Sequence, residues 1–516
     1  MKITPIKIIF ATEILTLFLV VFHILPKEAS LTLLAILLIY FIFSSLEDST
    51  TLFIASIPIF ISLAITENFD SLSTARLLII VLFLKYLITK RKEITNCIKK
   101  LSFKSILKNH RIELFTILFF TTLILSILAA PHTIEAAKKV IYLINLVLIF
   151  PVIKSIIKDK KTLKRTIKAI LISGLIVFII GLGQLISVYF LNIGEFWDWW
   201  ADHFSYGFYG QNLQKIVKNM NAWFTHSPLG PSVIRLFGSF TDPHSFGLYL
   251  LLIIPFIIYL LFPKTEKLRK HRIPKKYSIY WLWLLTTLFF IVLTGTRGIW
   301  LTSAAAIMGI IILAFLKLNK EKILTFILLI TIMFISLIPI SSIYTTVPQF
   351  QEKNTKDIDT SLILKRLTSI IDLEEESNQG RIYIWKQSLN TLKNNWLIGI
   401  GIGNFPLVID LPVEMRKAGA TAHNLYLNFA VESGIFSLIF LCLIFLEILI
   451  TAIMLLKRKM TYKMRALITG IAIFIFWVFA YSLFDIALLD ERVFLLFLTT
   501  TALIYSIKQN PQLLNE

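Results

Sequence analysis

Long apolar runs, separated by polar segments, dominate the hydropathy pattern of this chain. Each run approaches the roughly 20 residues that a helix needs to cross the hydrocarbon core of a bilayer. Two of the runs are short. If one of them is not a transmembrane helix, a second must also be removed to keep the basic loops on one side of the membrane, so 12 to 14 spans fit the pattern. The prediction is about fourteen transmembrane helices, at residues 8–25, 31–45, 51–66, 73–89, 112–130, 139–153, 169–190, 244–262, 279–295, 299–316, 323–340, 425–452, 466–484 and 493–507.

The composition supports a membrane protein over a set of soluble domains. Of the 516 residues, 56% are hydrophobic and only 16% are charged, and the mean hydropathy is +0.77. A water-soluble surface of this size requires a larger charged fraction. We therefore expect an all-α polytopic membrane protein with residues 1–516 in a single membrane domain.

The placement of the basic residues predicts the orientation of the chain. The formal net charge of +21 could indicate nucleic-acid binding, but 30 of the 52 Lys and Arg residues lie between apolar runs, in segments 90–111, 154–168, 263–278, 317–322 and 457–465. The predicted helices put all five segments on one side, which the positive-inside rule makes cytoplasmic. We expect cytoplasmic termini in a cytoplasmic (inner) membrane, with membrane lipids rather than nucleic acid as partners of this charge.

Cysteine and histidine usage gives no sign of a disulfide framework or a metal site. Cys97 falls in a predicted cytoplasmic loop and Cys442 in an apolar run, so the two cannot be paired. No His or Cys cluster has the spacing of metal ligands. We expect neither a metal ion nor a cofactor.

Two long segments, 191–243 and 341–424, interrupt the pattern, and the predicted topology puts both on the extracytoplasmic side. Loops of this length are usually functional or disordered, and neither has a disordered composition. The first is rich in aromatic residues, with Phe196-Trp197-Asp198-Trp199-Trp200 and later Trp223. An interfacial anchor and a sugar-stacking platform both account for such a segment.

The second segment contains a candidate amphipathic helix at residues 380–396. Its apolar residues recur at spacings of three and four: Ile382, Trp385, Leu389, Leu392 and Trp396. We expect this helix to lie along the membrane surface, with Arg381 in its first turn.

Arginines at the predicted extracytoplasmic edge run against the charge bias that orients the chain. Arg297 lies in a Thr-Gly-Thr-Arg-Gly turn between two apolar runs, and Arg381 begins the surface helix. Their planar guanidinium groups are suited to a phosphate or diphosphate, because each can donate two hydrogen bonds to adjacent oxygens. Arg235 is a third such residue. Snorkelling or ion pairing with a loop carboxylate is the alternative for each of them.

His423 lies where the second long segment re-enters the membrane, on the same predicted side as the arginines. A histidine there can act as a general base, or it can cap the helix that begins at Asn424. A phosphate-anchored donor beside a proton-accepting imidazole would suit group transfer to a hydroxyl. Glu432 lies in an apolar run, needs a partner there, and is a possible supporting residue.

These residues together resemble the O-antigen ligase and polymerase superfamily, with the resemblance confined mainly to residues 230–440. Each motif is weak alone, but their order and shared side make the set more specific. The motifs are RLFGSFTDPHSFG from Arg235 to Gly247, the TGTRG turn, Gly380-Arg381 with Trp385, the GIGIGNF stretch, Ala422-His423-Asn424 and Glu432-Ser433-Gly434. One departure is His244, because family members often carry asparagine after the proline at this place.

The resemblance implies a metal-independent glycosyltransferase with a C-type membrane fold and an undecaprenyl-diphosphate-linked glycan as donor. Arg297 and Arg381 would hold the donor diphosphate, and His423 would deprotonate the acceptor hydroxyl. Arg235, His244, Asn424 and Glu432 would bind substrate or support these residues. The acceptor would be a glycan or lipid hydroxyl for a ligase or polymerase of cell-surface polysaccharide, or a protein hydroxyl for an O-oligosaccharyltransferase.

A lipid-linked oligosaccharide flippase is the competing interpretation, because many helices with basic inner loops suit a transporter equally well. Transporters commonly contain internal repeats and charged residues near the bilayer midplane. This chain has no evident repeat between its halves, and its informative residues cluster on the predicted outer side. A scaffold role would leave the outer arginines beside a histidine unexplained.

Overall fold

The computed structural model describes residues 4–63, 72–99, 102–187, 190–191, 193–219, 223–227, 230–263, 275–318, 321–345, 376–409 and 421–515. Most of them are helical. The first part of the chain forms α1 (Pro5–Val21), α2 (Ala29–Phe43), α3 (Leu46–Ser56), α4 (Thr74–Thr89), α5 (Arg91–Lys99), α6 (Phe103–Asn109), α7 (Arg111–Ser126), α8 (Thr133–Val147), α9 (Ile149–Ile156) and α10 (Lys160–Ser187).

A surface region of short elements follows α10. It consists of α11 (Ile193–Trp200), a π-helical turn η3 (Ala201–Ser205), α12 (Tyr206–Tyr209), α13 (Gln211–Lys218) and an antiparallel hairpin of β1 (Phe224–Ser227) and β2 (Gly230–Ile234). The hairpin is the departure from the predicted all-α class.

The rest of the chain is again helical. It forms α14 (Pro243–Leu261), α15 (Lys275–Leu293), α16 (Arg297–Phe315), α17 (Glu321–Thr345), α19 (Glu376–Asn394), a 3-10 turn η7 (Phe405–Val408), α20 (Leu425–Ser433), α21 (Ile435–Leu456), α22 (Tyr462–Tyr481), η9 (Ala487–Leu489), α23 (Glu491–Gln509) and η10 (Pro511–Asn515). Polar side chains cap several of these helices: Asp242 accepts a hydrogen bond from Ser245 N at α14, and Asp490 from Arg492 N at α23.

Eight helices among the described residues are long and apolar enough to cross a membrane, by length and composition. They span Arg111–Ala129, Thr133–Ile156, Lys160–Ser187, Pro243–Leu261, Arg297–Phe315, Lys322–Pro339, Ile435–Leu456 and Tyr462–Tyr481. The described residues therefore form a helical, multi-pass membrane domain. Each of the fourteen predicted runs contains a helix, but several are too short, as in 51–66, where helix α3 ends at Ser56.

Helices α14 and α22 form the centre of the bundle. In each of them, 83% of the most apolar stretch is buried inside the protein, against 22% for the span that contains α7. The two helices approach closely, because Gly470 of α22 lies against Pro255 of α14. The helices around this pair therefore present more of their apolar surface to lipid.

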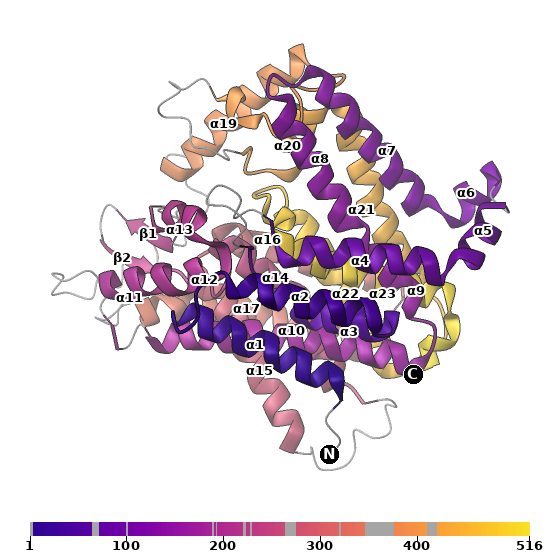
Figure 1. The fold of residues 1–516 in the computed structure, drawn as a ribbon, viewed down its shortest axis with the longest axis horizontal. Helices are drawn as coiled ribbons and strands as arrows, with labels where there is room; N and C mark the ends of the chain where they lie inside the picture. Colours follow the sequence, from indigo (N-terminus) through magenta and orange to yellow (C-terminus); the bar gives the residue numbers. More distant parts are fainter. Residues whose placement is uncertain are drawn as a thin grey trace.

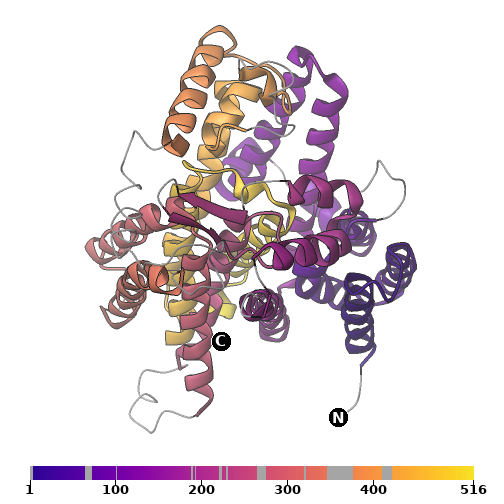
Figure 2. The same cartoon turned by 90° about the vertical axis from the view of Figure 1, so that its left-hand side faces the viewer.

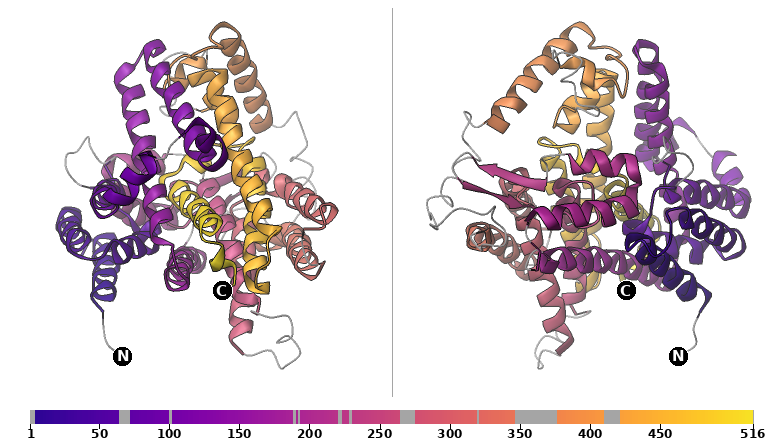
Figure 3. Two further views of the ribbon diagram at one scale, coloured as in Figure 1. Left: turned by 90° about the vertical axis from the view of Figure 1, so that its right-hand side faces the viewer. Right: turned by 60° about the vertical axis from the view of Figure 1, so that its left-hand side comes forward.

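The elements that carry the two long segments lie toward one side of the molecule. Figure 1 shows α11, α13 and the β1–β2 hairpin on the left with α19 above them, and α5, α6 and the C-terminus toward the right. The hairpin faces the viewer in Figure 2, which looks onto that left-hand side. Helices α7, α8, α19, α20 and α21 form the upper part of the molecule in Figures 1 and 3.

The aromatic segment is partly a local core. Phe196, Trp200 and Trp223 are buried and pack together with Phe237, whereas Trp197 and Trp199 are only partly buried. Two of the four tryptophans in this segment are thus buried by packing within the protein. The composition alone does not distinguish such a local core from an interfacial anchor.

Helix α19 differs from the predicted surface helix in its start and in its packed face. It begins at Glu376, so Arg381 lies in the second turn, beyond the free N-terminal amides. Ile384 and Leu392 pack against the cluster around Phe405, and Ser388 is fully buried. The apolar residues of the predicted amphipathic helix therefore do not all face the same way. Leu392 packs against the protein, whereas Leu389 and Trp396 are more than half exposed.

The predicted span at 425–452 is broken into α20 and α21 at Gly434. This glycine has φ of +81°, a left-handed conformation that ends α20 and is unfavourable for residues with a Cβ atom. The chain enters α21 with Ile435 N donating to the carbonyl of Trp396, at 2.8 Å. A Cβ atom on Gly434 would lie 2.1 Å from the carbonyl oxygen of Leu397. The break therefore docks α20 and α21 onto the turn after α19.

We expect Gly434→Ala to destabilise the protein by on the order of 3 kcal/mol, because the new Cβ atom meets backbone and the backbone conformation is strained. Thermal unfolding of the purified protein in detergent measures this. Gly183→Ala in α10 is the matched control, since a Cβ atom there meets nothing within 4 Å. Equal unfolding temperatures for both variants would show that the break at Gly434 is not a structural requirement.

Candidate functional site

The site begins where the chain leaves the β1–β2 hairpin and meets the turn between α15 and α16. Arg235 Nε donates to the carbonyl of Thr294 at 2.6 Å, and its Nη2 donates to Thr296 Oγ1 at 3.2 Å. Thr294 Oγ1 in turn donates to Thr296 Oγ1 at 2.9 Å. The two threonines of the TGTRG turn thus hold the guanidinium group of Arg235 in a fixed orientation.

Arg235 and Arg297 lie close together at this turn. Arg297 is the first residue of α16, directly after the two threonines. Burial and, to a smaller extent, the charge of Arg297 lower the pKa of Arg235 to about 10, although nearby acidic groups raise it. Arg235 therefore stays protonated at neutral pH, and the turn presents two positive charges at one place.

Buried Gln184 of α10 holds the segment after Arg235. Its Oε1 accepts hydrogen bonds from Phe237 N at 3.0 Å and from Gly238 N at 2.7 Å. Leu236 N donates to the carbonyl of Leu293, at 3.0 Å, at the end of α15. The backbone on the C-terminal side of Arg235 is thereby attached to two membrane helices.

His244 stands in the first turn of α14 and contacts groups from three other segments. Its Nε2 lies 3.5 Å from Arg235 Nη2, and its Nδ1 lies 2.7 Å from Tyr481 Oη and 3.7 Å from Asp485 Oδ2. A guanidinium group can only donate, so Nε2 is assigned as the acceptor and Nδ1 as the protonated nitrogen. His244 therefore links the arginines to the end of α22.

His423 is held beside the same carboxylate. Its Nδ1 lies 3.4 Å from Asp485 Oδ2, and its φ of +46° is a conformation that few residues other than glycine adopt. Leu425 N donates to the carbonyl of Ser482 at 2.8 Å, which brings the start of α20 to the end of α22. The ring of His423 remains 46% exposed, so a substrate can reach its other nitrogen.

Asp485 is the central residue of the site, and the sequence reasoning did not select it. Burial alone would raise the pKa of its carboxyl group, but the two histidines and the charge of Arg381 hold that pKa well below its ordinary value. The carboxylate is thus ionised and lies between two imidazoles. The available signal was its place in the predicted extracytoplasmic turn 485–492, on the same side as the arginines.

The backbone on the N-terminal side of His423 is fixed by hydrogen bonds to both the N–H and the carbonyl group of Ala422. Ala422 N donates to Asn428 Oδ1 at 3.1 Å, and the carbonyl of Ala422 accepts a hydrogen bond from Trp385 Nε1 at 2.9 Å. Trp385 belongs to α19, the helix that carries Arg381. The hydrogen bond therefore sets the position of α19 relative to His423.

Glu432 and Asn424, two candidate residues, have structural roles in this arrangement. Glu432 is buried, and it accepts hydrogen bonds from Phe405 N at 3.2 Å and from Asn428 Nδ2 at 3.0 Å. Asn424 caps α20 by accepting a hydrogen bond from Leu427 N at 3.0 Å. The cap of this helix is thus Asn424 and not His423, whose capping role was the alternative to a general base.

The GIGIG stretch is a structural turn. Gly399 has φ of +71°, and a Cβ atom there would lie 2.4 Å from the carbonyl carbon of Glu432. Ile400 N donates to the carbonyl of Val431 at 3.0 Å, and Ile402 N donates to Ser126 Oγ at 3.2 Å. The turn therefore attaches the end of α20 to the end of α7.

Part of the site lies in a region that resembles a known family. Residues 282–442 match the family model described as O-antigen ligase. This part of the chain is similar to O-antigen ligases. No curated protein matches the sequence. The matched O-antigen ligase region contains Arg297, Arg381 and His423, whereas Arg235, His244 and Asp485 lie outside it and join the site through the fold.

Asp485 is the carboxylate that both His244 and His423 contact. Among the described residues, no group of three or more His, Cys, Asp or Glu side chains is arranged to hold a metal ion. The positive groups of the site are instead the side chains of its arginines.

We expect Glu432→Ala to lower stability by roughly 2 to 4 kcal/mol, because it leaves Phe405 N and Asn428 Nδ2 buried without acceptors. Thermal unfolding in detergent measures this loss. Glu135→Ala is the matched control, because Glu135 is exposed and pairs with Lys138 at the surface, so its removal should be nearly neutral. A near-neutral Glu432→Ala variant would contradict the structural role given to this carboxylate.

Proposed function

We propose that this protein transfers a glycan from an undecaprenyl-diphosphate donor to an acceptor hydroxyl on the extracytoplasmic face of the cytoplasmic membrane. The observation that carries the proposal is the pairing of a half-exposed His423 with the buried carboxylate of Asp485, in a site that also contains arginines. The ligase-type region that contains His423 supports a lipid-linked glycan as the donor.

In the proposed reaction, the acceptor oxygen attacks the anomeric carbon of the donor sugar, and the bond from that carbon to the diphosphate oxygen breaks. The hydroxyl proton passes to Nε2 of His423. Nδ1 faces Asp485, which orients the ring and stabilises the imidazolium that forms. The products are a new glycosidic bond and the lipid diphosphate.

Arg297 and Arg381 would hold the diphosphate and neutralise its growing negative charge. The charge of Arg381 helps to lower the pKa of Asp485, which supports a role for Arg381 beside the proposed base. Arg297 lies beside Arg235, whose own hydrogen bonds to the TGTRG turn occupy part of its guanidinium group. With charge supplied in this way, the reaction would need no divalent metal, and transfer should persist in EDTA.

The extracytoplasmic location rests on the positive-inside distribution of the basic loops. The elements that carry Arg235 and Arg381 lie on the opposite side of the fold from α5 and α6, which belong to the basic segment 90–111 (Figure 1). The proposed acceptors are the hydroxyls of a lipid-anchored glycan, as in an O-antigen ligase or polymerase, or of a protein. A flippase would move the donor without breaking its diphosphate bond.

We expect His423→Ala to bind the donor but to lose transfer by roughly 10²-fold or more, because the proposed base is missing while the arginines remain. The assay incubates purified protein with an undecaprenyl-diphosphate oligosaccharide and an acceptor, and follows transferred glycan at equal protein level. His423→Asn is the companion variant, since it can form local hydrogen bonds but is no base near neutral pH. Robust transfer by His423→Asn would remove the base assignment.

Arg297→Lys and Arg381→Lys should each lower transfer by roughly 10²-fold, because they keep the charge but lose the bidentate geometry that a diphosphate uses. The same transfer assay measures the effect, with protein level in the membrane as the test of intact insertion. Arg458→Lys, in the loop between α21 and α22, is the matched control. Near-normal transfer by both site variants would reduce these arginines to packing or topological roles.

A further inference from the structure

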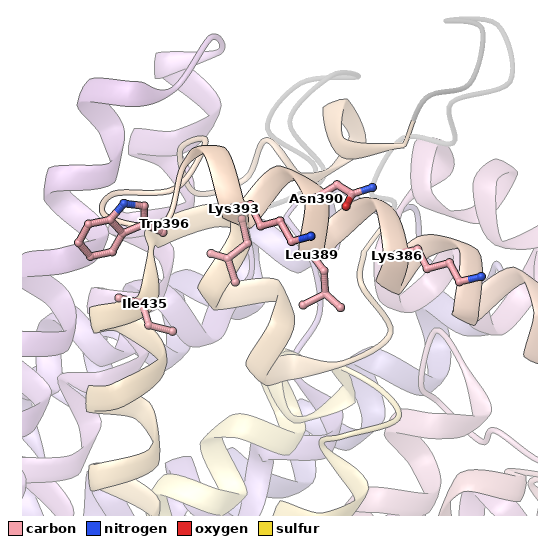
Figure 4. A pocket seen from close by; sticks show the side chains of 7 residues that line it. Lys386, Leu389, Asn390, Lys393, Trp396 and Ile435 are labelled. Carbon is pink, nitrogen blue, oxygen red and sulfur yellow. The ribbon is translucent and has the colours of Figure 1, made fainter.

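A groove between α19 and α21 lies outside the site described above. Its volume is about 700 Å³. Figure 4 shows several of its side chains in a row along α19, with Ile435 at the start of α21. The groove is lined by Lys386, Leu389, Asn390, Leu392, Lys393, Trp396 and Ile435.

The chemistry of the lining is apolar with two positive charges. Lys386 and Lys393 are exposed and are seven residues apart, which puts them on nearly the same side of α19, roughly 10 Å apart along the helix axis. Neither ammonium group has an ion-pair partner within the part of the chain that the structure describes. The lining contains no acidic residue. A ligand that combines negative charge with apolar chains matches such a surface.

The groove is continuous with a surface that faces lipid. Ile435 is the first residue of a helix long and apolar enough to span the membrane, and the next turn of that helix exposes Phe436 and Ile439. Leu389 and Trp396 continue this exposed apolar surface along α19. Tryptophan and lysine at the end of a membrane span are typical of the headgroup level, where an indole ring and an ammonium group both remain partly solvated.

We infer that this groove binds the headgroup of an anionic phospholipid, with its phosphate between Lys386 and Lys393 and its acyl chains along Leu389, Trp396 and α21. The face that α19 presents to the rest of the protein is the adjacent one, formed by Ile384 and Ser388, and Leu392 lies at the border between this face and the groove. The helix is therefore held between the protein on one face and the bilayer on the adjacent face. This binding does not depend on the proposed glycan transfer.

The test uses the full-length protein in nanodiscs that contain brominated phosphatidylcholine or brominated phosphatidylglycerol, with tryptophan fluorescence as the readout. The difference between wild type and Trp396→Phe isolates the signal of Trp396. We expect the anionic lipid to quench Trp396 more strongly than the neutral lipid. Lys386→Gln with Lys393→Gln should remove this preference, which corresponds to roughly 30-fold weaker enrichment of the anionic lipid for two lysines.

Two further variants keep the result specific. Lys386→Arg with Lys393→Arg retains the charge and should retain the preference. Lys138→Gln with Lys139→Gln removes the same charge from α8 and should leave the Trp396 signal unchanged. Equal quenching of Trp396 by both lipids, or none by either, would overturn the assignment, and so would a preference that survives in the Lys386→Gln, Lys393→Gln protein.

Discussion

A buried carboxylate at the end of α22 is the interaction on which the rest of the site depends. Asp485 is desolvated, and a desolvated carboxylate stays ionised only when positive or hydrogen-bonding groups surround it. His244 of α14, His423 before α20 and Arg381 of α19 supply these groups. Segments far apart in the sequence must therefore come together around Asp485. The most buried pair of helices, α14 and α22, provides the rigid base on which they meet.

The same constraint explains which polar residues are catalytic candidates and which are supports. Glu432 and Asn428 use their hydrogen-bonding groups on backbone amides and on each other, and so fix the peptide before His423. His423 keeps one nitrogen toward Asp485 and a half-exposed ring. A strained backbone at an accessible histidine is maintained only when surrounding contacts hold it, and here Asn428 and Trp385 supply those contacts. Helix α19 connects this support to the lipid groove, because Trp385, Arg381 and the two groove lysines belong to one helix.

Much of the fold could be predicted from hydropathy, because helices are the main means of satisfying backbone groups in lipid. Each predicted run contains a helix, but hydropathy did not reveal the break at Gly434, which depends on a tertiary contact with Leu397. The arginines and His423 could be found from their unusual place at the membrane edge. Asp485 could not be chosen from among the acidic residues of its turn, because its importance comes from two histidines, one 62 and one 241 residues away in sequence, that only the fold brings to it.

The central claim is that the site breaks the bond between glycan and lipid diphosphate, with Asp485 orienting the base. The most direct measurement is the release of undecaprenyl diphosphate by purified protein and by its Asp485→Asn variant, in EDTA, with an undecaprenyl-diphosphate oligosaccharide and an acceptor present. The account predicts release together with glycan transfer for the wild type, and a loss of roughly 10²-fold for the variant, because the imidazole loses its orienting charge. Movement of the donor across a membrane without release, or release that is unchanged in the variant, would contradict it.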